Sequence, residues 1–222
     1  MSGLIFAEVA VIGNLKFTLK ELLMQNKLKT LFSMSLLLVG LSGCVVGNQI
    51  GHSGKDVYST FGNIDVRDGE HAGDLENNSG NITVGDNAKV KSVDIVNGNI
   101  DIGEFSEAYS LETVNGNIDV AKEVFITRSV KTVNGHINIH QGVNVGTNLV
   151  ASNGDITLGK KSVVKGDIIY EDTFLTSYAD KTPKLKVAEG AVIEGDIHLY
   201  RYVKVVLPDS ISQDKVVKHY LD

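Results

Sequence analysis

Apolar and polar positions along this chain follow a repeat of 18 to 19 residues. Clear copies of the sequence N-G-x-I-x-[VIL] begin at Asn97, Asn115, Asn134 and Asn153. Weaker copies begin at Phe61 and Ser79, and the glycines of all the copies lie at 62, 80, 98, 116, 135 and 154. The spacing is therefore 18 residues between the first four glycines and 19 afterwards. A fixed period of this length indicates a solenoid in which each repeat is one coil.

Two further apolar columns keep the same phase as the repeated isoleucine. One column is Leu75, Val93, Leu111, Val130, Leu149 and Ile168; the other is Ala72, Val90, Ala108, Ile126, Val145 and Val164. The step between the columns changes from three residues to four, so the change from 18 to 19 falls at one corner. Each I-x-[VIL] segment alternates apolar and polar residues, which is typical of a short strand with one buried face.

Three apolar columns predict three short strands per coil around a narrow core. No coil can bury its apolar side alone, so the coils must stack. We therefore predict an all-β chain, folded as a single-stranded parallel β-helix over residues 59–207 with seven coils. A hexapeptide helix is excluded because steps of six from Ile100 reach Ser106 and Glu112. This favours a right-handed β-helix.

The repeat is interrupted after Ile168. Residues 192–197 copy residues 163–168 at an interval of 29, which leaves about 10 residues beyond one coil. We predict that these form a loop insertion near 170–183. Residues 208–222 follow the last alternating segment and are predicted to form a C-terminal cap, with a short helix over 210–221 and Ser210 as its N-cap.

The N-terminal segment has the pattern of a signal peptide. From Met24, two lysines precede an apolar run over 31–41, and the small residues Ser42 and Gly43 follow. The run is shorter than the roughly 20 residues that a membrane-spanning helix needs. We predict a signal peptide over 1–43, with Met24 as a candidate start, and a lipid-anchored linker over 44–58.

The sequence Leu41-Ser42-Gly43-Cys44 resembles the lipobox of bacterial lipoproteins. The resemblance implies cleavage before Cys44 and acylation of its sulfur, with palmitate as a candidate acyl group. Such a lipid anchors a chain to a membrane without a spanning helix. Because Val45 and not aspartate follows the cysteine, the resemblance implies the outer membrane, with the chain on the periplasmic side.

The N-G-x-I coils resemble a family of bacterial exported proteins of uncharacterised function. More loosely, they resemble the bactofilin-type polymer-forming β-helices. The resemblance covers roughly residues 61–207 and implies the fold, not an activity. Bactofilins are cytoplasmic and lack a lipobox, so this chain departs from them in its predicted localisation.

The outward residues of the I-x-[VIL] strands form two polar columns. These are Asn63, Asn81, Asn99, Asn117, His136 and Asp155, and Asp65, Thr83, Asp101, Asp119, Asn138 and Thr157. The candidate polar binding face comprises Asn99, Asp101, Asn117, Asp119, His136 and Asn138. Asp101 and Asp119 should lie about 5 Å apart, as in a retaining glycosidase. With no evident asymmetry to separate an acid from a base, we favour a solvated face.

Other polar groups are interpreted as structural. Asn97, Asn115, Asn134 and Asn153 are predicted to stack at one corner with their amides bonded to one another, while the following glycines supply a positive φ. His136, Asn138 and His140 have a spacing compatible with a metal, but no carboxylate or thiol completes the set. The other histidines, His52, His71, His198 and His219, form no ligand pattern, so no metal site is predicted.

Composition and charge narrow the function further. The formal net charge of −6 disfavours nucleic acid as a partner. The chain has no nucleophile elbow, phosphate loop or C-x-x-C, so we predict neither an enzyme nor a cofactor. We predict an envelope scaffold on a lipid anchor at Cys44 that binds protein or polysaccharide or self-associates through its coil ends. The alternative is a polysaccharide-binding or polysaccharide-processing protein, which 6% aromatic residues and no Trp disfavour.

Overall fold

A computed structural model describes residues 11–12, 15–16, 47–172 and 182–220. The chain divides into two units, Met1–Gly43 and Cys44–Asp222. In the first unit, β1 (Val11–Ile12) and β2 (Leu15–Lys16) form an antiparallel pair. The rest of the predicted signal peptide, and Cys44 itself, lie outside the described residues. Within the described ranges, no helix has the length and apolar character needed to cross a membrane.

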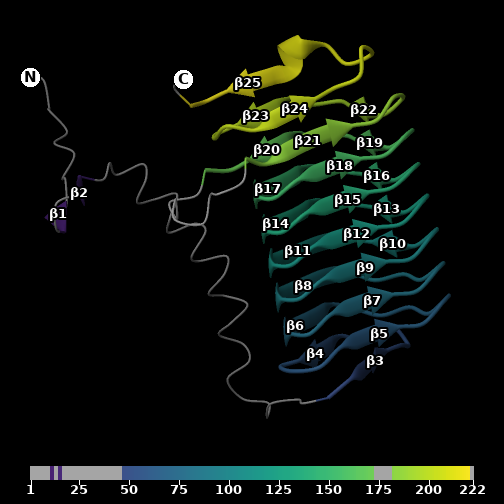
Figure 1. Ribbon diagram of the computed structural model, residues 1–222. Helices are drawn as coiled ribbons and strands as arrows, with labels where there is room; N and C mark the ends of the chain where they lie inside the picture. The colour runs from purple at the N-terminus through teal and green to yellow at the C-terminus, as the bar shows by residue number, and fades with distance from the viewer. Residues whose placement is uncertain (1–10, 13–14, 17–46, 173–181, 221–222) are drawn as a thin grey trace, which may run out of the picture. The chain divides into compact units, whose positions relative to one another are not determined.

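The second unit is a parallel β-solenoid, which confirms the predicted fold class (Figure 1). Its first sheet contains the I-x-[VIL] strands and has nine members: β3 (Gln49–Gly51), β5 (Ile64–Val66), β7 (Ile82–Val84), β9 (Ile100–Ile102), β12 (Ile118–Val120), β15 (Ile137–Ile139), β18 (Ile156–Leu158), β21 (Lys184–Val187) and β24 (Lys204–Val206).

A second sheet of nine strands follows the first around each coil. It comprises β4 (Val57–Ser59), β6 (Leu75–Ser79), β8 (Ser92–Asn97), β11 (Ser110–Asn115), β14 (Val130–Asn134), β17 (Leu149–Asn153), β20 (Ile168–Tyr170), β23 (Ile197–Leu199) and β25 (Val216–Lys218). A third sheet has five short strands: β10 (Glu107–Ala108), β13 (Phe125–Ile126), β16 (Asn144–Val145), β19 (Val163–Val164) and β22 (Val192–Ile193).

The three predicted apolar columns form the core. The repeated isoleucines of the first sheet and their neighbours in the second sheet are at most 1% exposed, and the residues of the third column are at most 8% exposed. The columns are Ile64, Ile82, Ile100, Ile118, Ile137, Ile156 and Leu185; Leu75, Val93, Leu111, Val130, Leu149, Ile168 and Ile197; and Ala72, Val90, Ala108, Ile126, Val145, Val164 and Ile193. Because seven consecutive coils each contribute one residue to each column, the hydrophobic core is continuous between the two terminal coils.

Both irregularities of the repeat lie where the pattern predicts them. Ala108 pairs with Ile126, but Leu111 pairs with Val130, so the first additional residue lies between β13 and β14. The larger insertion lies between β20 and β21, because Ile156 pairs with Leu185. Residues 173–181 of the predicted loop lie outside the described residues.

The glycines at the corner between the second and first sheets are required mainly because the backbones approach closely. Gly98 has the predicted positive φ, at +153°, and Gly62 and Gly80 in the weaker copies have φ angles of +116° and +130°. Gly116 and Gly135 do not have a positive φ. A Cβ on Gly116 would instead lie 1.8 Å from the carbonyl oxygen of Gly98 in the preceding coil. The predicted reason was therefore wrong for the later coils, where stacking and not φ excludes a side chain.

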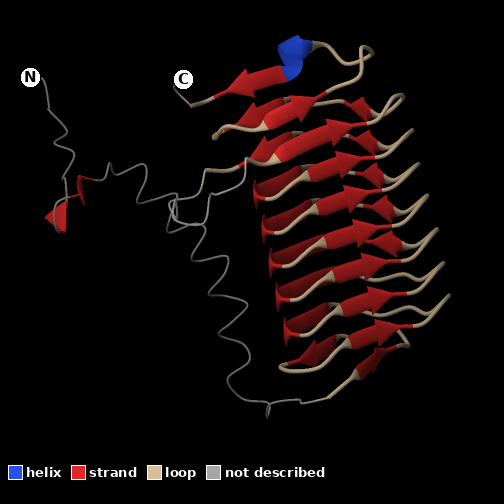
Figure 2. Ribbon diagram, viewed as in Figure 1, coloured by secondary structure: helices blue, strands red, loops and turns tan. Residues whose placement is uncertain are grey.

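The solenoid extends further at both ends than the pattern predicts (Figure 2). In the predicted linker, β3 and β4 already form a coil, which the pattern missed because Gln49 and Gly51 replace the usual apolar pair. The predicted C-terminal helix was wrong: only a 3-10 helix (Gln213–Lys215) forms, with Ser212 as its N-cap, and β25 follows. The β-branched Val216 and Val217 favour a strand, and β25 satisfies the otherwise unpaired edge of β23.

The C-terminal end of the core is nevertheless covered. Val203 and Ile211 are buried as members of the core, and Leu207 is partly buried and packs against this core. The ammonium of Lys215 donates hydrogen bonds to the carbonyl oxygens of Glu194 and Gly195, at 3.1 and 2.9 Å. These contacts close the apolar end of the solenoid to water.

Candidate functional site

The first polar column of the predicted binding face forms a continuous series of hydrogen bonds along the solenoid axis. Each side chain accepts a hydrogen bond from the backbone N–H of the equivalent residue one coil later. The donor–acceptor distances lie between 2.8 and 3.1 Å, and the backbone N–H of Lys184 is the last donor. We call this series the acceptor ladder, and its accepting side chains are Asn48, Asn63, Asn81, Asn99, Asn117, His136 and Asp155.

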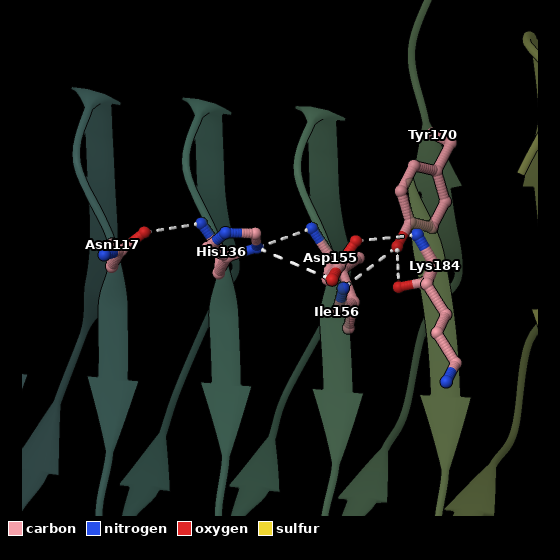
Figure 3. A network of polar contacts seen from close by, with 6 residues as sticks. All are labelled: Asn117, His136, Asp155, Ile156, Tyr170 and Lys184. Atoms are coloured by element: carbon pink, nitrogen blue, oxygen red, sulfur yellow. Dashed lines mark hydrogen bonds and ion pairs between the residues drawn. The ribbon is translucent and has the colours of Figure 1, made fainter. Parts of the chain in front are cut away.

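The acceptor ladder fixes the tautomer of its one histidine (Figure 3). The backbone N–H of Asp155 donates to His136 Nδ1 at 2.9 Å, so this ring nitrogen carries a lone pair and the proton lies on Nε2. The Oδ1 of Asp155 then accepts from the N–H of Lys184 at 2.8 Å. Asn99, Asn117 and His136 are thus brought together as predicted, but their acceptor atoms point along the axis.

Tyr170 joins the coils on either side of the loop insertion (Figure 3). Its hydroxyl accepts a hydrogen bond from the N–H of Ile156 at 3.0 Å and donates one to the carbonyl of Lys184 at 3.1 Å. In the preceding coil, the N–H of Ile137 bonds directly to the carbonyl of Asp155. The Tyr170 hydroxyl therefore takes the place of a direct backbone contact. Burial raises the pKa of this hydroxyl, which keeps it protonated and able to donate.

The second polar column brings Asp101, Asp119 and Asn138 into register on β9, β12 and β15. Asp119 is held from two sides: His140 Nε2 lies 3.1 Å from its Oδ1, and the Asn138 amide donates to its Oδ2 at 3.3 Å. Burial, and then the charge of Asp119, raises the pKa of Asp101. The expectation that nothing distinguishes the two carboxylates was wrong, because only Asp119 contacts a histidine ring in the described part of the chain.

The predicted asparagine corner is confirmed. The amides of Asn115, Asn134 and Asn153 each donate to the side-chain oxygen of the asparagine one coil earlier, at 2.8 to 2.9 Å. With Asn97 they form what we call the amide ladder. At its C-terminal end, the guanidinium of Arg201 donates to Asn153 Oδ1 and to the carbonyl of Ser152. A cationic donor thus ends the series.

A feature that the sequence reasoning missed lies on the outward face of the second sheet. Glu76, Asp94 and Glu112 occupy neighbouring strands in direct register, and we call these three the acidic stripe. No ion pair involves any of them within the described residues. Their positions could have been found, because each follows a core residue of the predicted Leu75 column by one residue.

The acidic stripe disfavours its own ionisation. Burial raises the pKa of Asp94 to about 7, and the charges of Glu112, Glu76 and Asp74 add to the rise. Burial also raises the pKa of Glu76, with further contributions from Asp74 and Asp56. Asp94 is therefore a carboxyl group that gains or loses its proton near neutral pH.

Neither face forms a recognisable metal centre. Over the residues that the structure describes, no group of three or more His, Cys, Asp or Glu side chains is placed to hold an ion. His140, which the sequence places on one face with His136 and Asn138, is engaged with Asp119. The predicted lipid attachment residue, Cys44, lies outside the described residues.

Comparison with known proteins identified no relative. No protein-family model matches the chain, no curated protein matches it, and no solved structure matches it.

Proposed function

We propose that this chain is a lipid-anchored protein of the bacterial cell envelope whose β-solenoid acts as a rigid scaffold for protein or polysaccharide partners. The sequence Leu41-Ser42-Gly43-Cys44, after an apolar run with lysines before it, supports the anchor. The first coil begins at Gln49, five residues after Cys44. Five residues reach at most about 18 Å, so an anchor at Cys44 keeps the first coil close to the membrane.

The observation that carries the scaffold proposal is the acceptor ladder. The side chains that a ligand-binding face would present to a ligand are used instead to join each coil to the next. The amide ladder, two residues earlier at the same corner, joins the same coils. Two parallel series of axial hydrogen bonds oppose sliding and bending of the coils, which favours a stiff spacer over a mobile binding site.

The anchor is tested by Cys44→Ala. Metabolic labelling with a palmitate analogue should label the wild-type chain and not the variant, and fractionation should move the variant from the membrane to the soluble fraction. Ser35→Ala, a change of similar size outside the Leu41–Cys44 motif, should label like the wild type. Equal labelling of Cys44→Ala and wild type would refute the lipoprotein proposal.

A polysaccharide-processing function is the second candidate, and the asymmetry of Asp101 and Asp119 favours it. Glycoside hydrolysis needs one carboxyl that stays protonated and one that stays charged. The raised pKa of Asp101 favours its protonated form, and the contact with His140 favours the charged form of Asp119. Complementation of a deletion strain separates the candidates, because a scaffold predicts that Asp101→Asn/Asp119→Asn is folded and functional. A folded but inactive double variant, with Asp65→Asn active, would favour the enzyme.

A further inference from the structure

Two histidines that are 21 residues apart in the sequence meet at the C-terminal end of the solenoid. His198 lies on β23, in register with Val217 of β25. The backbone N–H of His219 donates to the carbonyl of Leu199 at 2.8 Å, which fixes His219 directly beyond β25. The ring nitrogens His198 Nδ1 and His219 Nε2 consequently lie 3.1 Å apart.

Neighbouring side chains hold both imidazoles in this arrangement. The ring of Tyr200 stacks on His219, with centroids 4.2 Å apart and planes 9° from parallel. On the far side of His198, the Oδ2 of Asp167 lies 3.9 Å from Nε2. A carboxylate near this nitrogen favours the tautomer with a proton on Nε2, which leaves a lone pair on Nδ1. The lone pair faces His219.

The separation of the two nitrogens suits a bound metal ion. Nitrogen ligands lie about 2.0–2.1 Å from zinc. Two such ligands of one ion are about 2.9 Å apart at a right angle and about 3.3 Å apart at the tetrahedral angle. The observed 3.1 Å falls between these values. The separation of the two nitrogens is therefore compatible with one ion bound to both, after the rings turn so that their lone pairs converge.

We propose that His198 and His219 form a two-histidine site for a divalent transition-metal ion of the Zn²⁺, Ni²⁺ or Cu²⁺ class. Neutral imidazole is a side chain that suits these ions, whereas carboxylates suit Mg²⁺ and Ca²⁺. His198 Nδ1 binds through the lone pair that faces His219, while the proton that His219 Nε2 donates in the hydrogen bond moves through water to its Nδ1, which frees the Nε2 lone pair for the ion. Water completes the coordination. The ion joins β25 to β23 and so fastens the C-terminal end of the solenoid. This site does not depend on the proposed anchor or scaffold function.

The site is tested by isothermal titration of the metal-free full chain with ZnCl₂ and with NiCl₂. The wild type should bind one ion and show a raised thermal midpoint at saturation. His198→Asn and His219→Asn should each weaken binding by at least tenfold. Asp167→Asn should weaken it by about tenfold, as expected for a carboxylate behind a ligand histidine, while its Oδ1 still accepts from the N–H of Asp196.

Two control variants make the assignment specific. His71→Asn changes an exposed histidine far along the solenoid, and His140→Asn removes the partner of Asp119; both should bind like the wild type. If circular dichroism shows that His198→Asn or His219→Asn has lost its β-structure, NMR of the wild type tests the site instead. Among the imidazole signals, only those of His198 and His219 should change their chemical shifts when Zn²⁺ is added. A metal concentration of about 1 mM suffices to detect a weak site. The proposal would be overturned if no binding were seen at that concentration, or if both variants still bound the metal.

Discussion

The face of the solenoid that carries the acceptor ladder and the face that carries the acidic stripe are built from the same repeat, but the side chains of these two columns are used in opposite ways. At the corner just before the strands of the first sheet, each accepting side chain of the acceptor ladder receives a hydrogen bond from the backbone of the next coil. On the second sheet, the acidic stripe places three carboxyl groups side by side with no cation bound to them in the described chain. Stacking therefore stabilises a side chain that can accept from the backbone, and penalises one that repeats a charge.

The largest expected effect comes from the corner that joins the two faces. In Gly116→Ala the new Cβ would lie 1.8 Å from the carbonyl oxygen of Gly98, so the coils must separate. We expect a loss of several kcal/mol, on the scale of severe overpacking, and disruption of both ladders. The control is Gly69→Ala, where a Cβ meets nothing within 4 Å and only the φ of +70° is unfavourable. Thermal unfolding should show the control within about 2 kcal/mol of wild type.

Asp94→Asn tests the acidic stripe. Because folding raises the pKa of Asp94, the folded chain holds a proton between pH 4 and 7 that the unfolded chain releases, and stability falls as pH rises through this window. The rise from 3.8 to about 7 corresponds to at most about 4 kcal/mol, which solvent screening reduces to about 2.

The neutral variant should therefore be about 2 kcal/mol more stable than wild type at pH 8. It should also lose most of the slope of stability against pH. Urea unfolding at pH 5 and pH 8 measures both effects, with Asp65→Asn on the first sheet as the control. An unchanged slope in Asp94→Asn would show that the two faces do not differ in this way.

The repeat explains how much of this contrast was predictable from the sequence. Periodicity identified the buried columns, the amide ladder and the insertion, because Ile118 and Asn134 recur at the coil length. Periodicity also placed Asn117 and His136 outside the core, but could not show that their acceptor atoms turn along the axis. The pairing of His198 with His219 was hidden because it depends on β25, a strand predicted as a helix.

Asn134→Ala tests the amide ladder. The Asn134 amide donates to Asn115 and its oxygen accepts from Asn153, so alanine removes two side-chain hydrogen bonds. We expect a loss of about 1–2 kcal/mol, measured as a lower urea midpoint with an unchanged m-value. Asn144→Ala on the third sheet removes only a 3.4 Å contact within its own turn and should cost less. If Asn134→Ala and Asn144→Ala lost the same free energy of unfolding, the hydrogen bonds between stacked amides would not contribute measurably to stability.

The smallest effect is expected at His136, where the acceptor ladder changes from asparagine to histidine. His136→Ala removes the acceptor of the Asp155 N–H, which becomes solvated because the site is exposed. The loss should be about 0.5–1 kcal/mol. His136→Asn restores the residue of the preceding coils and should stay within about 0.5 kcal/mol of wild type.

Hydrogen exchange at the Asp155 amide gives a local measurement of the same contact. Exchange should accelerate in His136→Ala and stay slow in His136→Asn, since an amide oxygen can occupy the position of Nδ1. Ring ¹⁵N shifts of the wild type should show the proton of His136 on Nε2, as the hydrogen bond at Nδ1 requires. Faster exchange in both variants would mean that the imidazole is the required acceptor at this coil. The ladder would then depend on the particular side chain and not on the repeat.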